Sequence, residues 1–481
     1  MKCKLFLLLI VLVALGAMSS SPTAGATTLP ANGRIAYRAG SEIRVMNSDG
    51  SGVTRLTYSP QESEGDLAWS PDGRRLAYYR GRADANGNMS YSSICIINAY
   101  GNDLQVLVDE GAFDEVGGPA WSPDGTKIAF SGTLDGDSDI YVINVDGTGL
   151  VNLTSDNGGR NALDSGPTWS PDGTKIAFAS DRDSSPEFLV NDIYVMNAAN
   201  GGNVLNLTQT GDAAHEFQAK WSPDGTKIAF VREWDPNFAG DIFVMNADGD
   251  NQTRLTVTSV SVEDYLGGWS PDGTKIIFSS ERAGTHDIFV MNADGSEQTR
   301  LTFKPTLEMQ PTWQPLPAGT FVKEPTNDAY VVSSSKNKTY NRPFLQVVNA
   351  QADRIAYLKF SVQDIAAPVA SASLHLYVTN DSPDGGSVYV TPPIYAGSTT
   401  QWLETGLTWN NAPAIVGAPL VQWGRVRVGR WVDVDVTAAV AAAQVGDGRA
   451  SFAILNNSAN MAAYSSQEGA RAPELVVVTT E

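Results

Sequence analysis

Cysteine and histidine are scarce in this chain of 481 residues. It has two cysteines, Cys3 and Cys95, and three histidines, His215, His286 and His375. Cys3 falls in the N-terminal leader, and one remaining thiol cannot form an internal disulfide, so the cores alone have to stabilise the fold. Three histidines with no His-x-x-x-His pair and no Cys–His cluster exclude a histidine-rich metal enzyme.

Positive charge is also in short supply. Lys and Arg number 33 against 53 Asp and Glu, for a net charge of −20, and nearly all of the excess lies before residue 320. Nucleic acids and anionic membranes attract proteins through positive surface charge, so this balance argues against both as partners. With 42% hydrophobic residues the composition is that of a globular protein, and 45 Gly and 25 Pro predict many turns.

One apolar run has the flanks of a sorting signal, and it lies at the N-terminus. Lys2 and Lys4 precede apolar residues 5–17, and small residues follow up to Ala26. This order predicts a secretory signal peptide over residues 1–26, with an uncleaved anchor as the alternative. We expect an exported chain without a membrane span after cleavage. It would be extracellular or at the cell surface, or periplasmic where the host has an outer membrane.

Copies of Trp-Ser-Pro-Asp-Gly divide the first two thirds of the chain. Each copy precedes two strand patterns, a turn and a short further strand. Pro fixes φ and Gly accepts positive φ, so we attribute the repeated Asp to turn formation. Four short strands per period of about 45 residues are typical of β-propellers. The copies begin at Trp69, Trp121, Trp169, Trp221 and Trp269, and a degenerate copy begins at Trp313.

Six strands of the Ile-Tyr-Val-Met-Asn type predict six blades. The first, at 43–47, has no Trp before it but follows the strand pattern 34–37, whereas Trp313 has no strands after it. Joining these two ends completes the last blade and closes the ring, which removes exposed sheet edges. The predicted propeller spans residues 27–316.

The repeats over residues 34–315 resemble the TolB-type propeller repeat, a relative of the WD repeat. TolB is a periplasmic partner of cell-envelope lipoproteins, and an α/β domain precedes its propeller. Here the predicted propeller begins within a few residues of the predicted cleavage site, so we expect no such domain. The resemblance implies a propeller face that binds an extracellular or envelope protein or peptide.

An acidic residue comes shortly before the Trp of every repeat. Each lies where the chain enters the predicted innermost strand, so we expect all six at one mouth of the central channel. Carboxylates gathered there would repel one another unless a hard cation such as Ca²⁺ or a basic partner group compensated their charge. The alternative, which a repeated structural role favours, is that each acid accepts backbone N–H bonds in its own loop. The six are Glu64, Glu115, Asp164, Glu216, Asp264 and Glu308.

After a predicted linker at 317–320 the pattern changes. Residues 373–378 and 432–437 alternate between apolar and polar side chains, as in strands with one buried and one exposed face. Roughly 160 residues of this kind predict a mainly antiparallel β-sandwich or jelly roll over residues 321–481, with one helix at 437–444. The predicted fold class is therefore all-β: a six-bladed propeller followed by a sandwich.

Several segments of this second region resemble the DNRLRE-type domain, which is grouped with carbohydrate-binding modules of family 96. The longest is Trp-Leu-Glu-Thr-Gly-Leu-Thr-Trp-Asn-Asn-Ala-Pro at 402–413. The resemblance implies a β-sandwich of secreted proteins that binds acidic polysaccharide such as alginate. The other matching segments are 328–331, 357–360, 372–377, 431–437, 465–468 and 473–477.

Basic side chains are the candidates for binding such a polysaccharide, because Lys and Arg pair with uronic-acid carboxylates. Alternation places Lys359 opposite Leu358 and Phe360, on the outer face of a sheet. The alternative is that the basic residues form ion pairs with Asp433 and Asp435. The predicted carbohydrate-binding set is Arg354, Lys359, Arg425 and Arg427.

Most features that catalysis requires are absent from the sequence. It has no Gly-x-Ser-x-Gly motif, and its second region is not α/β, so the peptidase that follows some TolB-like propellers is not expected. We expect a monomeric, secreted, non-catalytic protein whose propeller binds protein or peptide and whose sandwich binds polysaccharide, with Ca²⁺ as the one candidate cofactor. The alternatives are a polysaccharide-degrading enzyme with its active site on the propeller face, or a purely structural surface protein.

Overall fold

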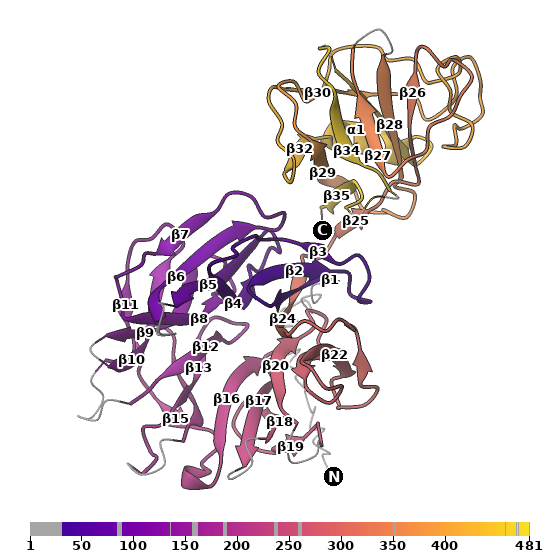
Figure 1. Ribbon diagram of the computed structural model, residues 1–481. Helices are drawn as coiled ribbons and strands as arrows, with labels where there is room; N and C mark the ends of the chain where they lie inside the picture. Colours follow the sequence, from indigo (N-terminus) through magenta and orange to yellow (C-terminus); the bar gives the residue numbers. More distant parts are fainter. Residues whose placement is uncertain are drawn as a thin grey trace, which may run out of the picture.

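The computed structural model describes residues 31–480, apart from 84–88, 135, 156–161, 186–189, 235–238, 258–261, 350–352, 457, 468 and 470. The predicted signal peptide lies outside the described residues. The predicted fold class is confirmed, because six four-stranded sheets form a ring and two further sheets form a C-terminal domain (Figure 1). Within the described chain, no helix has the length and apolar character needed to cross a membrane.

Each blade is an antiparallel sheet of four strands. Blade 1 consists of β24 (Glu308–Leu316), β1 (Ala31–Ala39), β2 (Glu42–Met46) and β3 (Thr54–Arg55). Blade 2 consists of β4 (Ser63–Trp69), β5 (Arg75–Ala83), β6 (Met89–Asn98) and β7 (Gln105–Val108). Blade 3 consists of β8 (Glu115–Trp121), β9 (Lys127–Leu134), β10 (Asp137–Asn144) and β11 (Val151–Asn152).

The other three blades follow the same order. Blade 4 consists of β12 (Ser165–Trp169), β13 (Lys175–Ser180), β14 (Asp192–Asn197) and β15 (Leu205–Asn206). Blade 5 consists of β16 (His215–Trp221), β17 (Lys227–Trp234), β18 (Ala239–Asn246) and β19 (Thr253–Arg254), after a short 3₁₀ turn at Gly211–Ala213. Blade 6 consists of β20 (Asp264–Trp269), β21 (Lys275–Ser280), β22 (Asp287–Asn292) and β23 (Thr299–Arg300).

The ring closes between the two ends of the propeller, as the sequence predicted. β24 pairs antiparallel with β1, and Trp313 lies opposite Ile35. Both side chains are buried, and they pack with Ile277 and Ile288 of blade 6. The closing blade is therefore fixed by a sheet ladder on one side and by an apolar contact with its neighbour on the other.

The Trp-Ser-Pro-Asp-Gly repeat forms the turn between the first and second strands of a blade. In blade 4 the Ser170 hydroxyl donates to Asp172 Oδ1 at 2.6 Å, and the N–H of Thr174 donates to the same oxygen at 3.0 Å. Gly173 completes the turn with a φ of +70°. Ser–Asp bonds of the same length recur in blades 2, 3, 5 and 6. The repeated Asp therefore serves the turn, as predicted.

A repeated threonine connects the third strand of a blade to the chain leaving that blade. In five blades its hydroxyl oxygen accepts the backbone N–H of an isoleucine in the third strand, at 2.9–3.0 Å. The hydroxyl proton then remains free to reach a buried carboxylate nearby. The threonines are Thr57, Thr154, Thr208, Thr256 and Thr302.

The C-terminal domain consists of two sheets that face each other across one core. One sheet has the order β25 (Thr320–Lys323), β35 (Glu474–Thr479), β29 (Val369–Asn380), β34 (Ala462–Ser465), β27 (Phe344–Val347), and β32 (Trp431–Asp435) also pairs with β29. The other has the order β26 (Asn327–Val332), β28 (Arg354–Ser361), β33 (Arg449–Leu455), β30 (Gly386–Val390), β31 (Val421–Trp423). The helix α1 spans Thr437–Val445, one residue longer than predicted.

Side chains alternate in this domain as the sequence predicted. Leu374 and Leu376 of β29 point into the core between the sheets, where they meet Leu358 and Phe360 of β28. The opposite face of β28 is also covered. A long segment between β30 and β31 folds over it and buries Trp402 completely. A face that alternation marks as outer is therefore not a solvent-exposed face.

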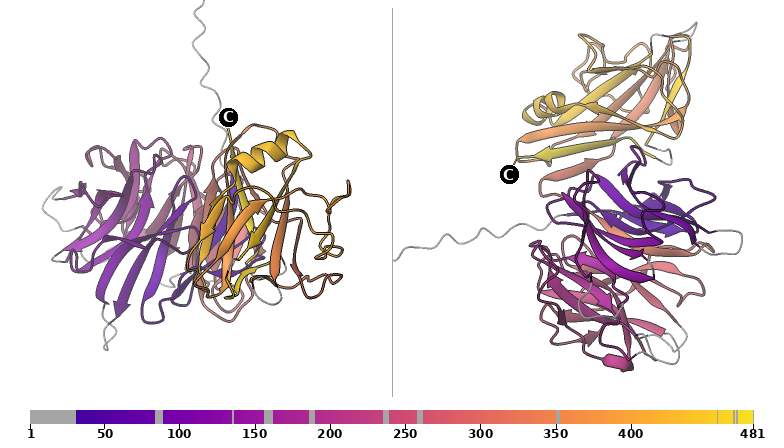
Figure 2. Two further views of the ribbon diagram at one scale, coloured as in Figure 1. Left: turned by 90° about the horizontal axis from the view of Figure 1, so that it is seen from above. Right: turned by 90° about the vertical axis from the view of Figure 1, so that its left-hand side faces the viewer.

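The two domains meet beside blades 1 and 2 (Figure 2). Tyr100, which follows β6, stacks on His375 of β29 with ring centres 4.4 Å apart, and its hydroxyl lies 3.3 Å from Glu474 of β35. Arg430 donates to the carbonyl of Gly101 at 3.2 Å. These contacts fix the sandwich against the loop between β6 and β7.

Candidate binding sites

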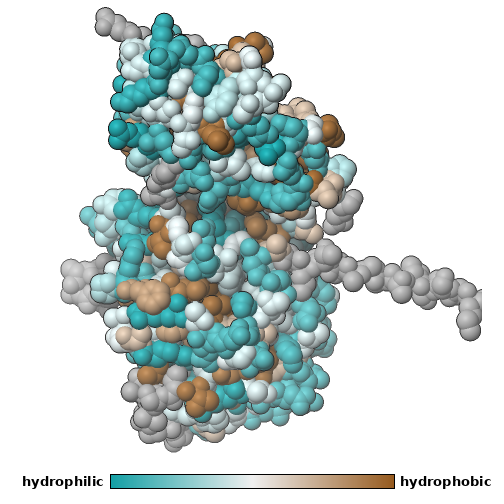
Figure 3. All heavy atoms as spheres, turned by 90° about the vertical axis from the view of Figure 1, so that its right-hand side faces the viewer, coloured by the Kyte–Doolittle hydropathy of each residue, from teal (hydrophilic) through white to brown (hydrophobic). Residues whose placement is uncertain are grey.

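Two cavities, one in the propeller and one between the domains, are the candidate binding sites of the molecule. On the face shown in Figure 3, apolar side chains lie in small groups separated by hydrophilic ones. The central channel of the propeller is a cavity of about 540 Å³. The charged residues in its lining are two cations and three anions: Arg38, Glu64, Asp66, Glu115 and Lys220.

A bulge in the first strand turns one residue per blade toward this channel. Gly118 and Gly166 occupy that position in two blades, with φ near +60°, whereas Asp66, Gln218 and Gln310 adopt φ of 51–55° in three others. A left-handed φ costs a residue with a side chain roughly 1–2 kcal/mol. Hydrogen bonds across blades offset that cost, because Gln310 Nε2 donates to Asp66 Oδ1 at 2.5 Å and Gly118 N–H donates to Asp66 Oδ2 at 3.1 Å.

Lys220 is one of the two cations in the channel lining. It lies two residues after Gln218 on β16. Burial lowers the pKa of its ammonium group, and the carboxylate of Asp66 opposes that shift. The channel thus places opposite charges on different blades around one water-accessible space, which suits a ligand with both charged and amide groups.

The six predicted acids do not gather into a cation site. Across the described ranges, no three of them have carboxylate oxygens within 4.8 Å of one another. Glu64 accepts hydrogen bonds from the hydroxyls of Thr57 and Ser59, and Glu216 accepts them from Thr210 and from Arg232 Nε at 2.7 Å. Asp164 and Asp264 pair with Arg182 and Arg282 at 2.8 Å, and Glu308 is buried beside Thr302.

The acids therefore lie at the junctions between successive blades. Their arginine partners belong to the same blade, whereas the hydroxyl partners of Glu64 and Glu216 come from the chain that leaves the preceding blade. These partners are side-chain groups, not the backbone N–H groups of the predicted alternative. Glu115 differs from the other five, because it is exposed and pairs in register with Thr133. In blade 3 the position of the buried acids is occupied by Val116, which lies opposite Gly132.

The predicted carbohydrate-binding residues also separate. Lys359 faces away from the sandwich core, as alternation required, but it is 2% exposed. Its ammonium group donates to the carbonyl of Trp402 and lies 4.6 Å from the centre of the Trp402 ring. Burial lowers the pKa of Lys359 to about 8. A polysaccharide outside the domain cannot reach this side chain, because the segment carrying Trp402 covers it.

Three of the four basic residues remain closer to the surface. Arg354 is half-buried and donates to Gln346 Oε1 at 2.6 Å. Arg425 and Arg427 are exposed on either side of Val426, which is buried and bonded through its backbone to Ser382.

The predicted alternative partners of the basic residues have other contacts. Asp433 lies 2.6 Å from His375, and Asp435 accepts the hydroxyl of Thr437 at 2.6 Å. Both aspartates lie on β32, and among the described residues neither forms an ion pair with Arg425 or Arg427.

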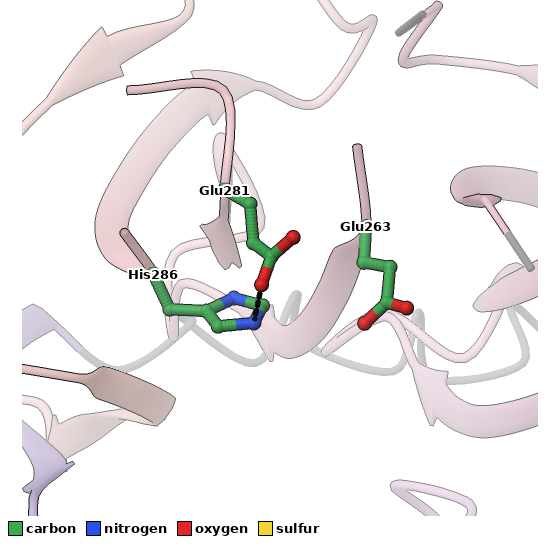
Figure 4. A group of neighbouring side chains, drawn as sticks. All are labelled: Glu263, Glu281 and His286. Atoms are coloured by element: carbon green, nitrogen blue, oxygen red, sulfur yellow. Dashed lines mark ion pairs between the residues drawn. The ribbon is translucent and has the colours of Figure 1, made fainter. Parts of the chain in front are cut away.

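Sequence reasoning missed a cluster of titratable side chains in blade 6 (Figure 4). Glu263, Glu281 and His286 place ligand atoms within 4.8 Å of one another, and they are the one such group among the described residues. His286 Nε2 lies 2.8 Å from Glu281 Oε1, and the Tyr265 hydroxyl donates to Glu263 Oε2 at 2.6 Å. The sequence did contain a signal for Glu263. This residue precedes Trp269 by six positions, and Glu115 precedes Trp121 by the same number.

Sequence reasoning also missed a cleft between the two domains. It has a volume of about 900 Å³ and is lined by residues of the propeller and of the sandwich. Arg34 and Tyr100 lie on the propeller side, and His375, Asp433 and Glu474 lie on the sandwich side. Arg34 and Glu474 approach to 3.7 Å, so part of this lining also holds the domains together.

Two sequence families match the chain. The family described as TolB beta propeller domain matches residues 31–239 and 213–352, which together cover about two thirds of the chain. Carbohydrate-binding module family 96 matches residues 319–479. None of the curated proteins is significantly similar to the chain.

Solved structures similar to the chain include two TolB proteins. TolB from Acinetobacter baumannii is 22% identical, with a TM-score of 0.49 over 60% of this chain and 69% of that one. A putative TolB from Agrobacterium tumefaciens is 22% identical, with a TM-score of 0.41 over 56% of this chain and 88% of that one. A chain of a nidogen/laminin complex is 15% identical, with a TM-score of 0.45 over 59% and 98%.

Proposed function

Because the chain belongs to the TolB beta propeller domain family and carries a family 96 carbohydrate-binding module after its propeller, we propose that it is an exported, non-catalytic binding protein. Its sandwich binds an anionic polysaccharide, and its propeller binds a protein or peptide. The monomeric chain would act outside the cytoplasm, at the cell surface or in the periplasm. In this proposal residues 1–26 are the signal peptide, 27–316 the propeller, 317–320 a linker and 321–481 the sandwich.

The observation that carries this proposal is the match of the carbohydrate-binding family to residues 319–479. The match covers both sheets of the sandwich, from β25 to β35. On this domain the exposed Arg425 and Arg427 supply the charge that an acidic sugar requires, since guanidinium groups pair with carboxylates in a bidentate geometry. We therefore assign the polysaccharide contact to the segment between β31 and β32.

The channel supports the propeller half of the proposal. Its lining offers Lys220, Arg38 and Asp66 together with the amides of Gln218 and Gln310. Paired charges and amides are the groups that recognise the backbone and termini of a peptide. A segment of an extracellular or envelope protein is the ligand that this lining fits.

Affinity electrophoresis of the whole protein tests the polysaccharide contact. We expect retardation in alginate and pectin gels but not in a neutral glucan gel, and its loss in the Arg425→Ala/Arg427→Ala variant. The matched control is Lys127→Ala/Lys175→Ala, which removes the same charge from exposed propeller positions and should leave the retardation unchanged.

Equal retardation of both double variants would contradict the assignment of the binding site. Absence of retardation in every gel would contradict polysaccharide binding. A fall in alginate or pectin viscosity during incubation would contradict the non-catalytic part of the proposal and favour a polysaccharide-degrading enzyme.

A further inference from the structure

Glu263, Glu281 and His286 lie at one end of blade 6, on three different segments. Glu263 immediately precedes β20, Glu281 immediately follows β21, and His286 immediately precedes β22. Antiparallel strands bring these three ends together. Backbone bonds hold them there, because Glu281 N–H donates to the Glu263 carbonyl at 3.2 Å and Glu308 N–H donates to the His286 carbonyl at 3.0 Å. Figure 4 shows both carboxylates directed toward the Nε2 side of the imidazole.

Among the described residues, the negative charge of this cluster has no lysine or arginine partner. Across the described ranges, the one ion pair of Glu281 is with His286, and Glu263 forms none. Arg282, the neighbour of Glu281, points the other way and pairs with Asp264 at 2.8 Å. Carboxylates that share a small space without compensation favour binding of a proton or a cation.

A third carboxylate adds negative charge beside this cluster. Glu233 of blade 5 lies near Glu263. Burial raises the pKa of Glu233 to about 7. The carboxylate of Glu263 contributes to this shift, so the negative charge of Glu233 adds to that of the cluster across the junction of blades 5 and 6.

The repeat provides an internal comparison, because each blade has positions equivalent to Glu263 and Glu281. In four blades these positions carry no pair of metal-ligand side chains, so the propeller does not require one there. Blade 5 carries His215 and Glu233 in register, beside the pair in blade 6. The four other pairs are Leu307/Gly40, Ser63/Gly81, Glu115/Thr133 and Leu163/Asp181.

The imidazole of His286 is buried with one nitrogen directed into the cluster. Its side chain is 7% exposed. Among the described residues its Nδ1 atom has no hydrogen-bond partner, so Nδ1 can carry the ring proton when Nε2 binds a cation. Its other nitrogen, Nε2, faces the two carboxylates. The Tyr265 hydroxyl meanwhile holds Oε2 of Glu263 and leaves Oε1 available, as outer hydrogen bonds do for metal-bound carboxylates.

We propose that Glu263, Glu281 and His286 bind a divalent transition-metal ion, with Zn²⁺ as the representative. One imidazole and two carboxylates form the ligand set that suits Zn²⁺, whereas Ca²⁺ requires a larger number of oxygen ligands. A tetrahedral Zn²⁺ site separates its ligand atoms by about 3.4 Å. The ligand atoms here lie within 4.8 Å of one another, and Nε2 and Oε1 lie 2.8 Å apart, so side-chain shifts of about an ångström reach that geometry. The 40% exposure of Glu281 leaves room for water in the remaining coordination position.

Imidazole NMR with ZnCl₂ as the probe tests this site directly, because the chain has only three histidines. In a ¹⁵N-labelled sample of the whole protein, the His286→Asn variant assigns the His286 signals. We expect ZnCl₂ to shift these signals and to saturate at one equivalent, and the His215 and His375 signals to stay in place. CaCl₂ should shift none of them.

Calorimetric titration of Glu281→Gln with ZnCl₂ provides the second measurement. The substitution keeps the shape of a partly exposed side chain and removes one ligand charge, so we expect Kd to rise at least tenfold. Glu297→Gln removes the same charge from an exposed position of the same blade and should leave Kd unchanged. Absence of a His286 shift, a shift confined to His215 or His375, or equal Kd values for the two variants would overturn the proposal.

Discussion

At the scale of single residues, burial decides what a charged side chain can do. Alternation along β28 correctly places Lys359 on the face opposite Leu358 and Phe360. It cannot reveal that residues around Trp402, more than forty positions later, fold over that face. The sequence therefore predicts the direction of this side chain but not its surroundings, because a covering segment is distant in the chain and its path is set by tertiary packing.

Lys359 makes the stability of the sandwich depend on pH. Burial lowers its pKa in the folded protein to about 8, below the ordinary value of 10.5, so the unfolded chain binds an extra proton between these values. Folding stability from this group therefore increases as pH rises from about 8 to about 10.5, and it is lost as pH falls.

Calorimetry of Lys359→Met should show this directly. We expect the difference in melting temperature between wild type and variant to change with pH between about 8 and 10.5, in favour of the wild type at the higher pH. Lys336→Met, an exposed position of the same domain, should give a difference that is flat over this range. A flat difference for Lys359→Met as well would show that its ammonium group is not perturbed.

At the scale of elements, repetition explains what the sequence predicts well and what it hides. Five copies of one turn motif define the blades, because Pro, Asp and Gly act locally at fixed positions. The cluster of Glu263, Glu281 and His286 is harder to see, since it depends on how one blade departs from the repeat. The buried acids show the same limit, because their spacing in the sequence is regular but their arginine and threonine partners lie on other segments of the chain.

The turn aspartate can be tested in blade 4. Asp172→Ala removes the acceptor of three hydrogen bonds, from the Ser170 hydroxyl and from the N–H and hydroxyl of Thr174, and should lower the free energy of unfolding by about 1 kcal/mol. Asp172→Asn keeps a carbonyl acceptor and should lower the free energy of unfolding by a smaller amount. Urea denaturation measures both.

The free energy of unfolding lost in Asp172→Ala should also depend on pH. Hydrogen bonds, first from Ser170, lower the pKa of Asp172, so its contribution is present above the ordinary aspartate pKa of 3.8 and is lost as pH falls below that value. We expect the difference in free energy of unfolding between wild type and Asp172→Ala to become smaller as the solution is acidified below pH 3.8. A difference that is independent of pH, or equal for Ala and Asn, would contradict the role of the ionised carboxylate.

At the scale of the whole molecule, the arrangement of the domains rests on a few side chains. The sequence predicts each domain, because each has its own pattern, but the junction joins residues of two unrelated patterns and has no local signature. Tyr100 is central to it, since its ring contacts His375 and Trp431 and its hydroxyl reaches Glu474.

Tyr100→Ala should release the sandwich from the propeller. We expect a larger radius of gyration in small-angle X-ray scattering and faster proteolysis between residues 316 and 320, with both domains still folded. Tyr91→Ala changes the same residue type near the other end of β6 and should alter neither measurement. Unchanged scattering for Tyr100→Ala would show that the remaining contacts, including Arg430 with the Gly101 carbonyl, are sufficient.

The pairing of β24 with β1 also affects how fast the propeller can fold. The innermost strand of blade 1 is the last of the propeller to be synthesised, some 270 residues after its partner. Such a high contact order slows folding, and until β24 arrives the edge of β1 remains open to other chains. Until residue 316 has been synthesised, β1 therefore lacks its partner, and a chain that ends before that point is expected to aggregate rather than to form a five-bladed ring.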